Sequence, residues 1–306
     1  MSDLRAEPLS PIDAATLWPQ LRRLSTEVIA TSVGENLLLT SGLAATGLTH
    51  LPRMPRTTVL GVKRGLGYRG VIVTRELAGG AGWEAVSLRL TRDMDDEVVT
   101  ALLAGAGLDV MRRSGRTLYL RYPEGTPHAT AIHRGGLMSY RQEQLYAVRH
   151  RNGGGHSALF RSPSRSDRAA IFRLYCRAVP QHVRSAEAPT AQDWRAVHDS
   201  YDCEHEFVAD GDRGLAAWAG FSGRECRIIV NDEVAGIGEA ALDLVERHLP
   251  RQGALVLADD QGQLAHRAVA RGYTALGVRH VCARRMAALN PLKEAVAVAE
   301  PFALPQ

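Results

Sequence analysis

The sequence lacks the paired cysteines of a disulfide framework or a zinc site. Its four cysteines are scattered without a Cys-x-x-Cys pair, which is typical of reduced thiols: Cys176, Cys203, Cys226 and Cys282. It also lacks an apolar run of the roughly 20 residues that a membrane-spanning helix needs, and its N-terminus lacks the basic and apolar segments of a secretory signal. We therefore expect a cytoplasmic protein without a membrane partner.

Lysine is scarce, and arginine supplies most of the positive charge. The net charge is +4 and the sequence pI is near 9.0, which favours anionic partners. Arginines cluster at 149–151, 161–173 and 279–285, but the clusters lack the interleaved aromatic residues that stack nucleic-acid bases. A solvated surface is therefore favoured over a nucleic-acid partner.

The chain length predicts two domains, at roughly 150 residues each for 306 residues. Gly153-Gly154-Gly155, set among polar residues, is typical of a flexible connection. We predict one domain at 1–148, a linker at 149–157 and a second domain at 158–286. The alanine- and proline-rich tail at 287–306 is expected to be loosely attached.

The first half alternates helical and strand patterns. Apolar residues at helical spacing predict helices at 14–31 and 37–48. Three strand-like runs then indicate an antiparallel meander. The predicted elements are strands at 57–63, 70–74 and 83–90, a helix from Asp95, a strand at 117–121, a short helix at 128–134 and a strand pair at 137–148.

The second half repeats this order. The predicted elements are helices at 167–178 and 191–198, strands at 207–209, 215–221 and 226–230, a helix from Val234, a strand at 254–258, a helix at 264–271 and a strand at 278–284. Equivalent positions in the halves keep a nearly constant offset, from 144 residues for Val71 and Leu215 to 136 for Gly136 and Gly272. This constancy predicts a duplicated fold.

Two glycines begin the helix that follows the strand at 226–230. A glycine in a helix interior lowers helix stability by about 1 kcal/mol relative to alanine, so we expect a further structural or functional requirement at Gly236 and Gly238. One candidate demand is tight packing of the helix on the sheet. The other is close approach of a ligand, because free N–H groups at a helix N-terminus bind phosphate oxygens.

The element order and the glycine turn resemble the GNAT superfamily of acyltransferases. In that family a loop of the form Gln/Arg-x-x-Gly-x-Gly/Ala wraps the pyrophosphate of acetyl-CoA with backbone amides. The matching segment is 233–238, which keeps both glycines, whereas Glu233 departs from the family pattern. The resemblance covers 158–286 and extends to 1–148, and it implies that Gly272-Tyr273 is a structural turn with Tyr273 in the core. It also implies acetyl-CoA as acyl donor, bound by Val230, Val234, Gly236, Ile237 and Gly238.

The fold class that follows is α/β, an α+β mixed sheet. It would form two GNAT-like domains, each with a largely antiparallel sheet and helices on both faces. In the first half the loop matching the glycine turn is acidic, with Asp93, Asp95, Asp96 and Glu97 and no glycine. Acids stabilise a helix N-terminus but repel a pyrophosphate. We therefore expect the first half to be a degenerate copy that keeps the fold.

A polar cluster at 198–206 offers imidazole, thiolate and carboxylate groups, but it lacks a metal-ligand spacing. We expect a solvated connection there and no metal. Glu225, at the start of a strand, is the candidate general base if it faces a cleft. His266, on the short helix, is the second catalytic candidate, and a surface histidine is the alternative.

The predicted function is an N-acetyltransferase that moves an acetyl group from acetyl-CoA to an amine of a small molecule or peptide. The tyrosine that commonly protonates the departing thiolate in the family would precede the Gly-aromatic turn by four residues, but Ala268 and Ile132 stand there. His266 and Tyr201 are the nearest substitutes. The alternative is a non-catalytic acyl-CoA sensor or protein-interaction module. A third is a nucleic-acid-associated protein, whose binding would fall steeply with salt.

Overall fold

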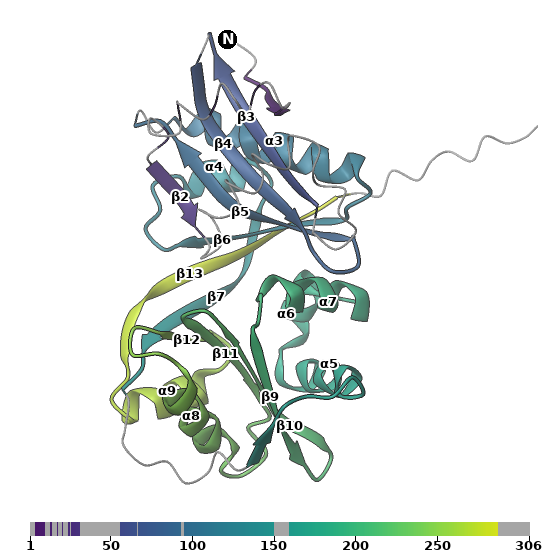
Figure 1. Ribbon diagram of the computed structural model, residues 1–306, viewed down its shortest axis with the longest axis vertical. Helices are drawn as coiled ribbons and strands as arrows, with labels where there is room; N and C mark the ends of the chain where they lie inside the picture. Colours follow the sequence, from purple (N-terminus) through teal and green to yellow (C-terminus); the bar gives the residue numbers. More distant parts are fainter. Residues whose placement is uncertain are drawn as a thin grey trace, which may run out of the picture.

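One mixed β-sheet runs through the part of the chain that the computed structural model describes (Figure 1). The described residues are 4–9, 13, 17, 20, 24, 26–30, 56–65, 67–92, 95–149 and 159–286. The strands are β1 (Ala6–Pro8), β2 (Thr26–Ala30), β3 (Thr57–Arg64), β4 (Gly67–Glu76), β5 (Gly82–Leu90), β6 (Thr117–Pro123), β7 (Met138–Ala147), β8 (Phe160–Arg161), β9 (His205–Gly211), β10 (Gly214–Ser222), β11 (Glu225–Val230), β12 (Ala254–Ala258) and β13 (Thr274–Arg285). The helices are α3 (Asp96–Arg112), α4 (Ala129–Arg134), α5 (Asp167–Ala178), α6 (Gln181–Glu187), α7 (Ala191–Ser200), α8 (Ile237–His248) and α9 (Gly262–Ala270).

The two halves of the sheet have equivalent strand orders when each is followed from its outer edge to the centre. It is β1-β3-β4-β5-β6-β13-β7-β12-β11-β10-β9-β8, with β2 added beside β5. Strands β4, β5 and β6 therefore correspond to β10, β11 and β12. Gly136 and Gly272, predicted to be equivalent, both have left-handed backbones, with φ of 85° and 88°. The duplication predicted from the residue offsets is present in the structure.

The two halves exchange their long strands. The last strand, β13, lies between β6 and β7, and β7 of the first half pairs with β12 of the second (Figure 1). The halves are consequently joined by a continuous hydrogen-bonded ladder rather than by a chain connection alone. Of the predicted linker at 149–157, only Arg149 is described, and the tail at 287–306 lies outside the described residues.

The helices cover the two faces of the sheet separately. Side chains alternate along a strand, so Cys226, Ile228 and Val230 of β11 pack under α8 and α9. Ile229 joins the opposite cluster, formed under α5, α6 and α7. The pairing is antiparallel except between β5 and β6 and between β11 and β12. The expected largely antiparallel mixed sheet with helices on both faces is confirmed.

Some sequence-based boundaries are wrong. Residues 26–30, included in the helix predicted at 14–31, form strand β2 on β5. The β-branched Val28 and Ile29 favour a strand, and both are buried in the core under α3. The helix predicted at 37–48 lies outside the described residues. Helix α6 was not predicted, and α8 begins at Ile237 rather than Val234. Among the described residues, no helix combines the length and apolarity needed to cross a bilayer.

Candidate functional site

The two glycines of the β11–α8 turn differ in their surroundings. Gly236 is the N-cap of α8 with φ of 76°, a left-handed conformation that favours glycine, and a Cβ added there would meet no atom within 4 Å. A Cβ added to Gly238 would instead meet the guanidinium of Arg267 from α9. This guanidinium is the mobile end of a long side chain, so a larger residue at 238 would displace Arg267 from the start of the helix.

The start of α8 is an electropositive corner. The Ala240 N–H donates to the Gly236 carbonyl at 3.0 Å, whereas in the described part of the chain the N–H groups of Gly238 and Glu239 have no acceptor. No side chain caps the helix. The Arg267 guanidinium lies beside these groups, although a cation is unfavourable at the positive end of a helix dipole. We call the N–H groups of Gly238 and Glu239 together with Arg267 the α8 corner; this arrangement suits an anion.

The parallel strands β11 and β12 separate next to this corner. Their register stops at Arg227 and Val256, although β11 continues to Val230 and β12 to Ala258. The Gln261 side chain bridges the gap. Its Nε2 donates to the Ile228 carbonyl at 2.6 Å, and its Oε1 accepts the Ala258 N–H at 3.0 Å. Main-chain groups of both strands therefore face a gap that one side chain fills.

Replacing Gln261 by alanine is expected to destabilise the protein by about 1–3 kcal/mol, because the Ile228 carbonyl and the Ala258 N–H would lose their partner. Urea unfolding measures the change. The matched control is Gln263→Ala, an exposed glutamine on the same helix, which should stay within about 0.5 kcal/mol of wild type. Equal stability of the two variants would show that the bridge contributes nothing.

The equivalent place in the first half is closed. The register of β5 with β6 stops at Ala85 and Leu120, and β2 then pairs with β5 in the space beyond. The N-terminus of α3 is capped, because Asp95 Oδ1 accepts the Glu97 N–H at 2.8 Å. Asp96 lies 2.6 Å from His128 Nδ1, and Asp93 lies outside the described residues. In the described part of the first half, the start of α3 is thus capped and β2 occupies the gap.

Glu225 faces the α5–α7 side of the sheet and is held by two arginines. Its carboxylate accepts from Arg279 at 2.8 and 3.0 Å and from Arg227 at 3.1 Å. Burial raises the pKa of Glu225, but Arg227 and Arg279 outweigh burial and leave the pKa below its usual value. Glu225 is therefore a carboxylate at neutral pH, with a reduced affinity for a proton. Its role as a base stays a prediction.

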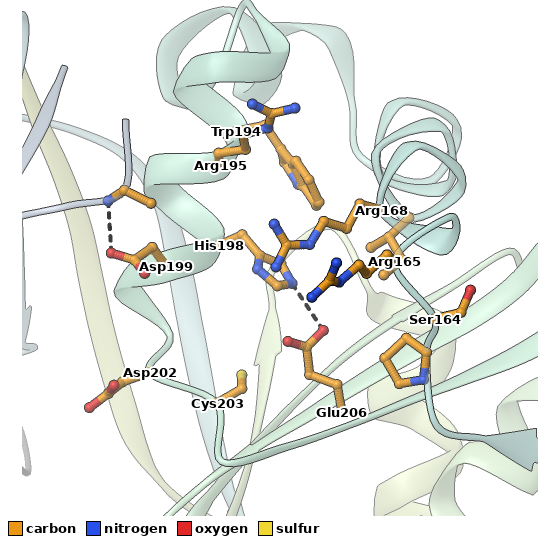
Figure 2. A pocket seen from close by; sticks show the side chains of 13 residues that line it. Ser164, Arg165, Arg168, Trp194, Arg195, His198, Asp199, Asp202, Cys203 and Glu206 are labelled. Atoms are coloured by element: carbon orange, nitrogen blue, oxygen red, sulfur yellow. Dashed lines mark hydrogen bonds and ion pairs between the residues drawn. The ribbon is translucent and has the colours of Figure 1, made fainter. Parts of the chain in front are cut away.

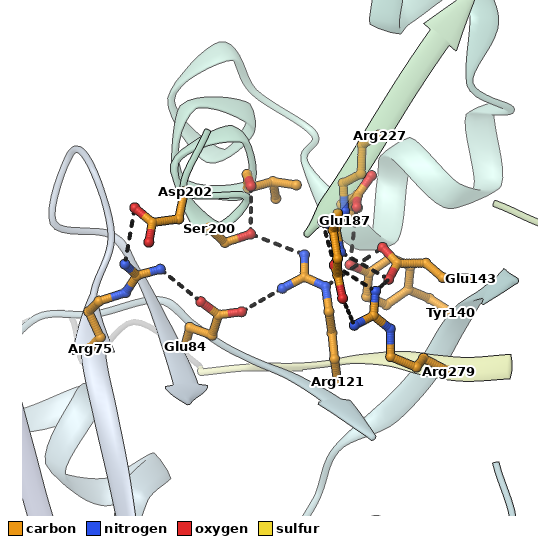
Figure 3. A network of polar contacts seen from close by, with 12 residues as sticks. Arg75, Glu84, Arg121, Tyr140, Glu143, Glu187, Ser200, Asp202, Arg227 and Arg279 are labelled. Atoms are coloured by element: carbon orange, nitrogen blue, oxygen red, sulfur yellow. Dashed lines mark hydrogen bonds and ion pairs between the residues drawn. The ribbon is translucent and has the colours of Figure 1, made fainter. Parts of the chain in front are cut away.

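A buried network of alternating charges lies where the two halves meet (Figure 3), and Glu225 joins it through Arg227 and Arg279. At its centre Glu143 lies 3.3 Å from Arg227, 3.3 Å from Arg279 and 3.7 Å from Arg121. Arg121 continues the network to Glu84 at 2.5 Å. Burial raises the pKa of Glu143, but the surrounding arginines outweigh it and lower the pKa to about 2. These residues come from both halves, and sequence spacing gave no signal that they would meet.

The structure does not bring the other predicted site residues to Glu225. His266 is exposed on α9, on the opposite face of the sheet. Val230 and Ile237 are buried in the core under α8, and Val234 packs against it, so these residues can meet a ligand mainly through their backbones. Tyr273 is buried as expected, and its hydroxyl donates to Glu246 at 3.1 Å.

Tyr201 lies between two arginines rather than in an open cleft. Its ring is 4.9 Å from Arg227 Cζ and 5.5 Å from Arg121 Cζ. Burial, together with the charge of Glu187, raises the pKa of the Tyr201 phenol. Tyr201 is consequently a weaker acid than a solvent-exposed tyrosine.

The polar stretch at 198–206 lines a cavity of about 450 Å³ (Figure 2). Its other walls come from the start of α5, from α7 and from Ala78 of the first half. Among the described residues, no three side chains gather as metal ligands. The sequence did not reveal this cavity, because two of the arginines that line it, Arg165 and Arg168, lie some thirty residues before the stretch.

Comparisons with known proteins identify the fold. No family model matches the sequence, and no curated protein matches it. A GCN5-related N-acetyltransferase from Sphaerobacter thermophilus superposes with a TM-score of 0.52 at 13% identity, over 93% of this chain and 96% of that chain. A tandem GNAT protein from the clavulanic acid biosynthesis pathway gives 0.49 at 16% identity, over 92% and 98%. The first of these likenesses, together with the duplicated strand order, shows a tandem GNAT-like fold.

Proposed function

We propose that the second half binds an acyl-CoA, with acetyl-CoA as the donor, and that its pyrophosphate lies at the α8 corner. The observation that carries the proposal is the open helix terminus beside Arg267, for which the described residues supply no anionic partner. Helix N-termini bind phosphate through free N–H groups and the helix dipole, and arginine adds charge-assisted hydrogen bonds. The similar structure from Sphaerobacter thermophilus is named a GCN5-related N-acetyltransferase, which agrees with this choice of ligand.

The residues at the corner fit the ligand. Gly236 leaves open space in front of the helix, so a phosphate oxygen can approach the backbone. Glu233, which departs from the family pattern, is exposed, and its N–H donates to Asn231 Oδ1 at 3.3 Å. We propose that Gly236 and Gly238 contribute amides, while Val230, Val234 and Ile237 contribute shape, because the Val234 N–H already donates to the Asn231 carbonyl at 3.0 Å. One acyl-CoA per chain is expected, because the matching place in the first half is closed by β2 and Asp95.

Titration calorimetry with acetyl-CoA tests this proposal directly. The expected result is a single site per chain. Binding at two sites per chain would contradict the closed first half, and no binding would overturn the proposal.

The second step of the proposal is acyl transfer to an amine. A neutral amine attacks the thioester carbonyl, a C–N bond forms, the C–S bond breaks, and CoA leaves as thiolate while the amine loses a proton. The α8 corner and Glu225 lie on opposite faces of the sheet, so the arm of the acyl-CoA would cross between β11 and β12, and the Gln261 side chain would have to leave the gap that it fills in this structure. The acceptor, a small-molecule or peptide amine, would approach from the α5–α7 side. Glu225 is the candidate that receives the proton, directly or through water.

Replacing Glu225 by glutamine is expected to slow acetyl transfer at least tenfold, because general bases typically contribute 10²–10⁴-fold. A thioester-release assay against a panel of amines measures the rate. The binding constant for acetyl-CoA should change little, which separates a role in proton transfer from loss of the fold. Glu204→Gln, an exposed carboxylate before β9, is the control. Unchanged turnover in Glu225→Gln would exclude the base role, and His266→Ala in the same assay tests the second candidate.

A specific observation supports the sensor alternative. Ala268 stands where the family's usual acid would be, and Tyr201 is half-buried between arginines with a raised pKa. Clear acetyl-CoA binding with no amine-dependent thioester release on any amine would favour the sensor over the enzyme.

A further inference from the structure

The 450 Å³ cavity at the junction of the two halves has a distinct chemical character. We call it the junction pocket; it is lined by Ala78, Pro163, Ser164, Arg165, Arg168, Ile171, Trp194, Arg195, His198, Asp199, Asp202, Cys203 and Glu206. Arg165 and Arg168 come from the start of α5, and Figure 2 shows both extending toward His198 and Glu206. Arg195 lies at the rim, on α7. Three cations from two separate elements therefore gather at one cavity.

The acidic residues of the junction pocket are already engaged. Asp199 accepts the Ala78 N–H at 2.8 Å, and Asp202 lies 3.9 Å from Arg75. Glu206 accepts the Trp218 Nε1–H at 2.9 Å and lies 3.4 Å from His198 Nε2. In the described part of the chain, by contrast, the side chains of Arg165, Arg168 and Arg195 make neither a hydrogen bond nor an ion pair. The charge of Arg168 helps to lower the pKa of Glu206, but no close contact joins the two side chains. The charges that no close contact compensates are therefore positive.

Helix stability does not explain where these arginines stand. Arg165 and Arg168 flank the N-terminus of α5, where a cation opposes the helix dipole. Asp167 supplies the favourable charge and is paired with Arg161 at 2.8 Å. Both arginines are exposed, and the charge of Arg168 also acts on Glu206. Neither side chain makes a close contact that offsets its repulsion at this terminus, and a bound anion would supply one.

The floor of the pocket is apolar and aromatic. Trp194 and Ile171 are buried there, and the His198 ring packs 4.9 Å from the Trp194 ring. Burial, with the charge of Glu206, raises the pKa of the Cys203 thiol to about 12. Cys203 is therefore a neutral thiol at physiological pH, and the pocket is suited to binding rather than to covalent chemistry.

The geometry points to a binding site for a small dianion, a dicarboxylate or a phosphate compound, held by Arg165 and Arg168 with its carbon skeleton on Trp194. Arginine forms charge-assisted, often bidentate hydrogen bonds with both kinds of group. The site is separate from the α8 corner, which lies on the other face of the sheet. Ala78 belongs to the first half, so a ligand here would contact both halves.

Calorimetric titration with succinate tests the site in wild type, and inorganic pyrophosphate is titrated into Gly236→Asp, in which the α8 corner no longer offers it a second site. Succinamide is the neutral counterpart of succinate and should not bind. Arg168→Gln should weaken binding of the dianion about tenfold or more, which is the usual effect of losing a charge-assisted hydrogen bond. Arg173→Gln is the matched control, because it removes the same charge from an exposed position on the same helix and should change affinity less than twofold.

Two further measurements keep this site distinct from the acyl-CoA site. The succinate titration is repeated in Gly236→Asp, which alters the α8 corner and should leave succinate binding unchanged. The affinity of Arg168→Gln for acetyl-CoA should equal that of wild type. Equal weakening by Arg168→Gln and Arg173→Gln, loss of dianion binding in Gly236→Asp, or absence of binding for both dianions would overturn the assignment.

Discussion

Replacing Gly236 by aspartate is expected to weaken acetyl-CoA binding at least about 100-fold. The new carboxylate would stand at the entrance to the α8 corner, where the pyrophosphate is proposed to lie. Two unit charges about 4 Å apart interact by roughly 4 kcal/mol at an effective dielectric of 20, which exceeds the energy of a 100-fold change. A Cβ at this position meets no atom within 4 Å, so the substitution does not disturb the core. Titration calorimetry gives the affinity.

Gly223→Asp is the matched control. Gly223 also has a left-handed backbone, with φ of 52°, and a Cβ there also meets no atom within 4 Å. Gly223 lies in the turn between β10 and β11. Gly223→Asp therefore adds the same charge and the same backbone strain away from the α8 corner. Its affinity for acetyl-CoA should equal that of wild type. If both variants bind acetyl-CoA as wild type does, the pyrophosphate does not lie at α8.

Replacing Glu143 by glutamine is expected to lower the free energy of unfolding by about 3–5 kcal/mol at neutral pH. Glu143 is buried among Arg121, Arg227 and Arg279, and removing its charge leaves the buried cations incompletely compensated. Urea unfolding gives the difference. Glu124→Gln, an exposed carboxylate after β6, should stay within about 0.5 kcal/mol of wild type.

The difference in the free energy of unfolding between wild type and Glu143→Gln should depend on pH, and the sign of this dependence follows from the pKa of Glu143. The pKa of Glu143 falls from an ordinary value of 4.5 to about 2 on folding. A depressed carboxyl pKa contributes stability above the unfolded value, and that stability is lost as pH falls through the folded value. The gap between wild type and Glu143→Gln, about 3 kcal/mol from the pKa difference, should therefore shrink between pH 4.5 and pH 2. A gap that does not narrow over this range would show that charge is not its cause.

Local patterns were sufficient for most elements of the second half. The predicted helix at 167–178 coincides with α5, and the strand at 226–230 falls within β11. The periodicity of apolar residues predicts such elements because the buried face of a helix or strand depends on residue types within one short segment of the chain. Predictions failed where contacts or backbone conformation outside the local pattern set the structure. Residues 26–30 form a strand because β5 has a free edge beyond Ala85. Helix α8 begins later than predicted because Gly236 takes a left-handed backbone conformation.

The sequence by itself determined the duplicated order of elements, the two glycines at Gly236 and Gly238 and the acidic loop that replaces them in the first half. These features depend on residues close together in the chain. Only the tertiary structure decided that Arg267 faces α8, that β2 fills the gap in the first half, that Glu225 is held by arginines, and that Arg165 and Arg168 meet His198. The physical reason is that each of these contacts joins elements that are far apart in the chain. A single sequence shows which side chains are present, but the packing of the sheet and helices decides which of them come together.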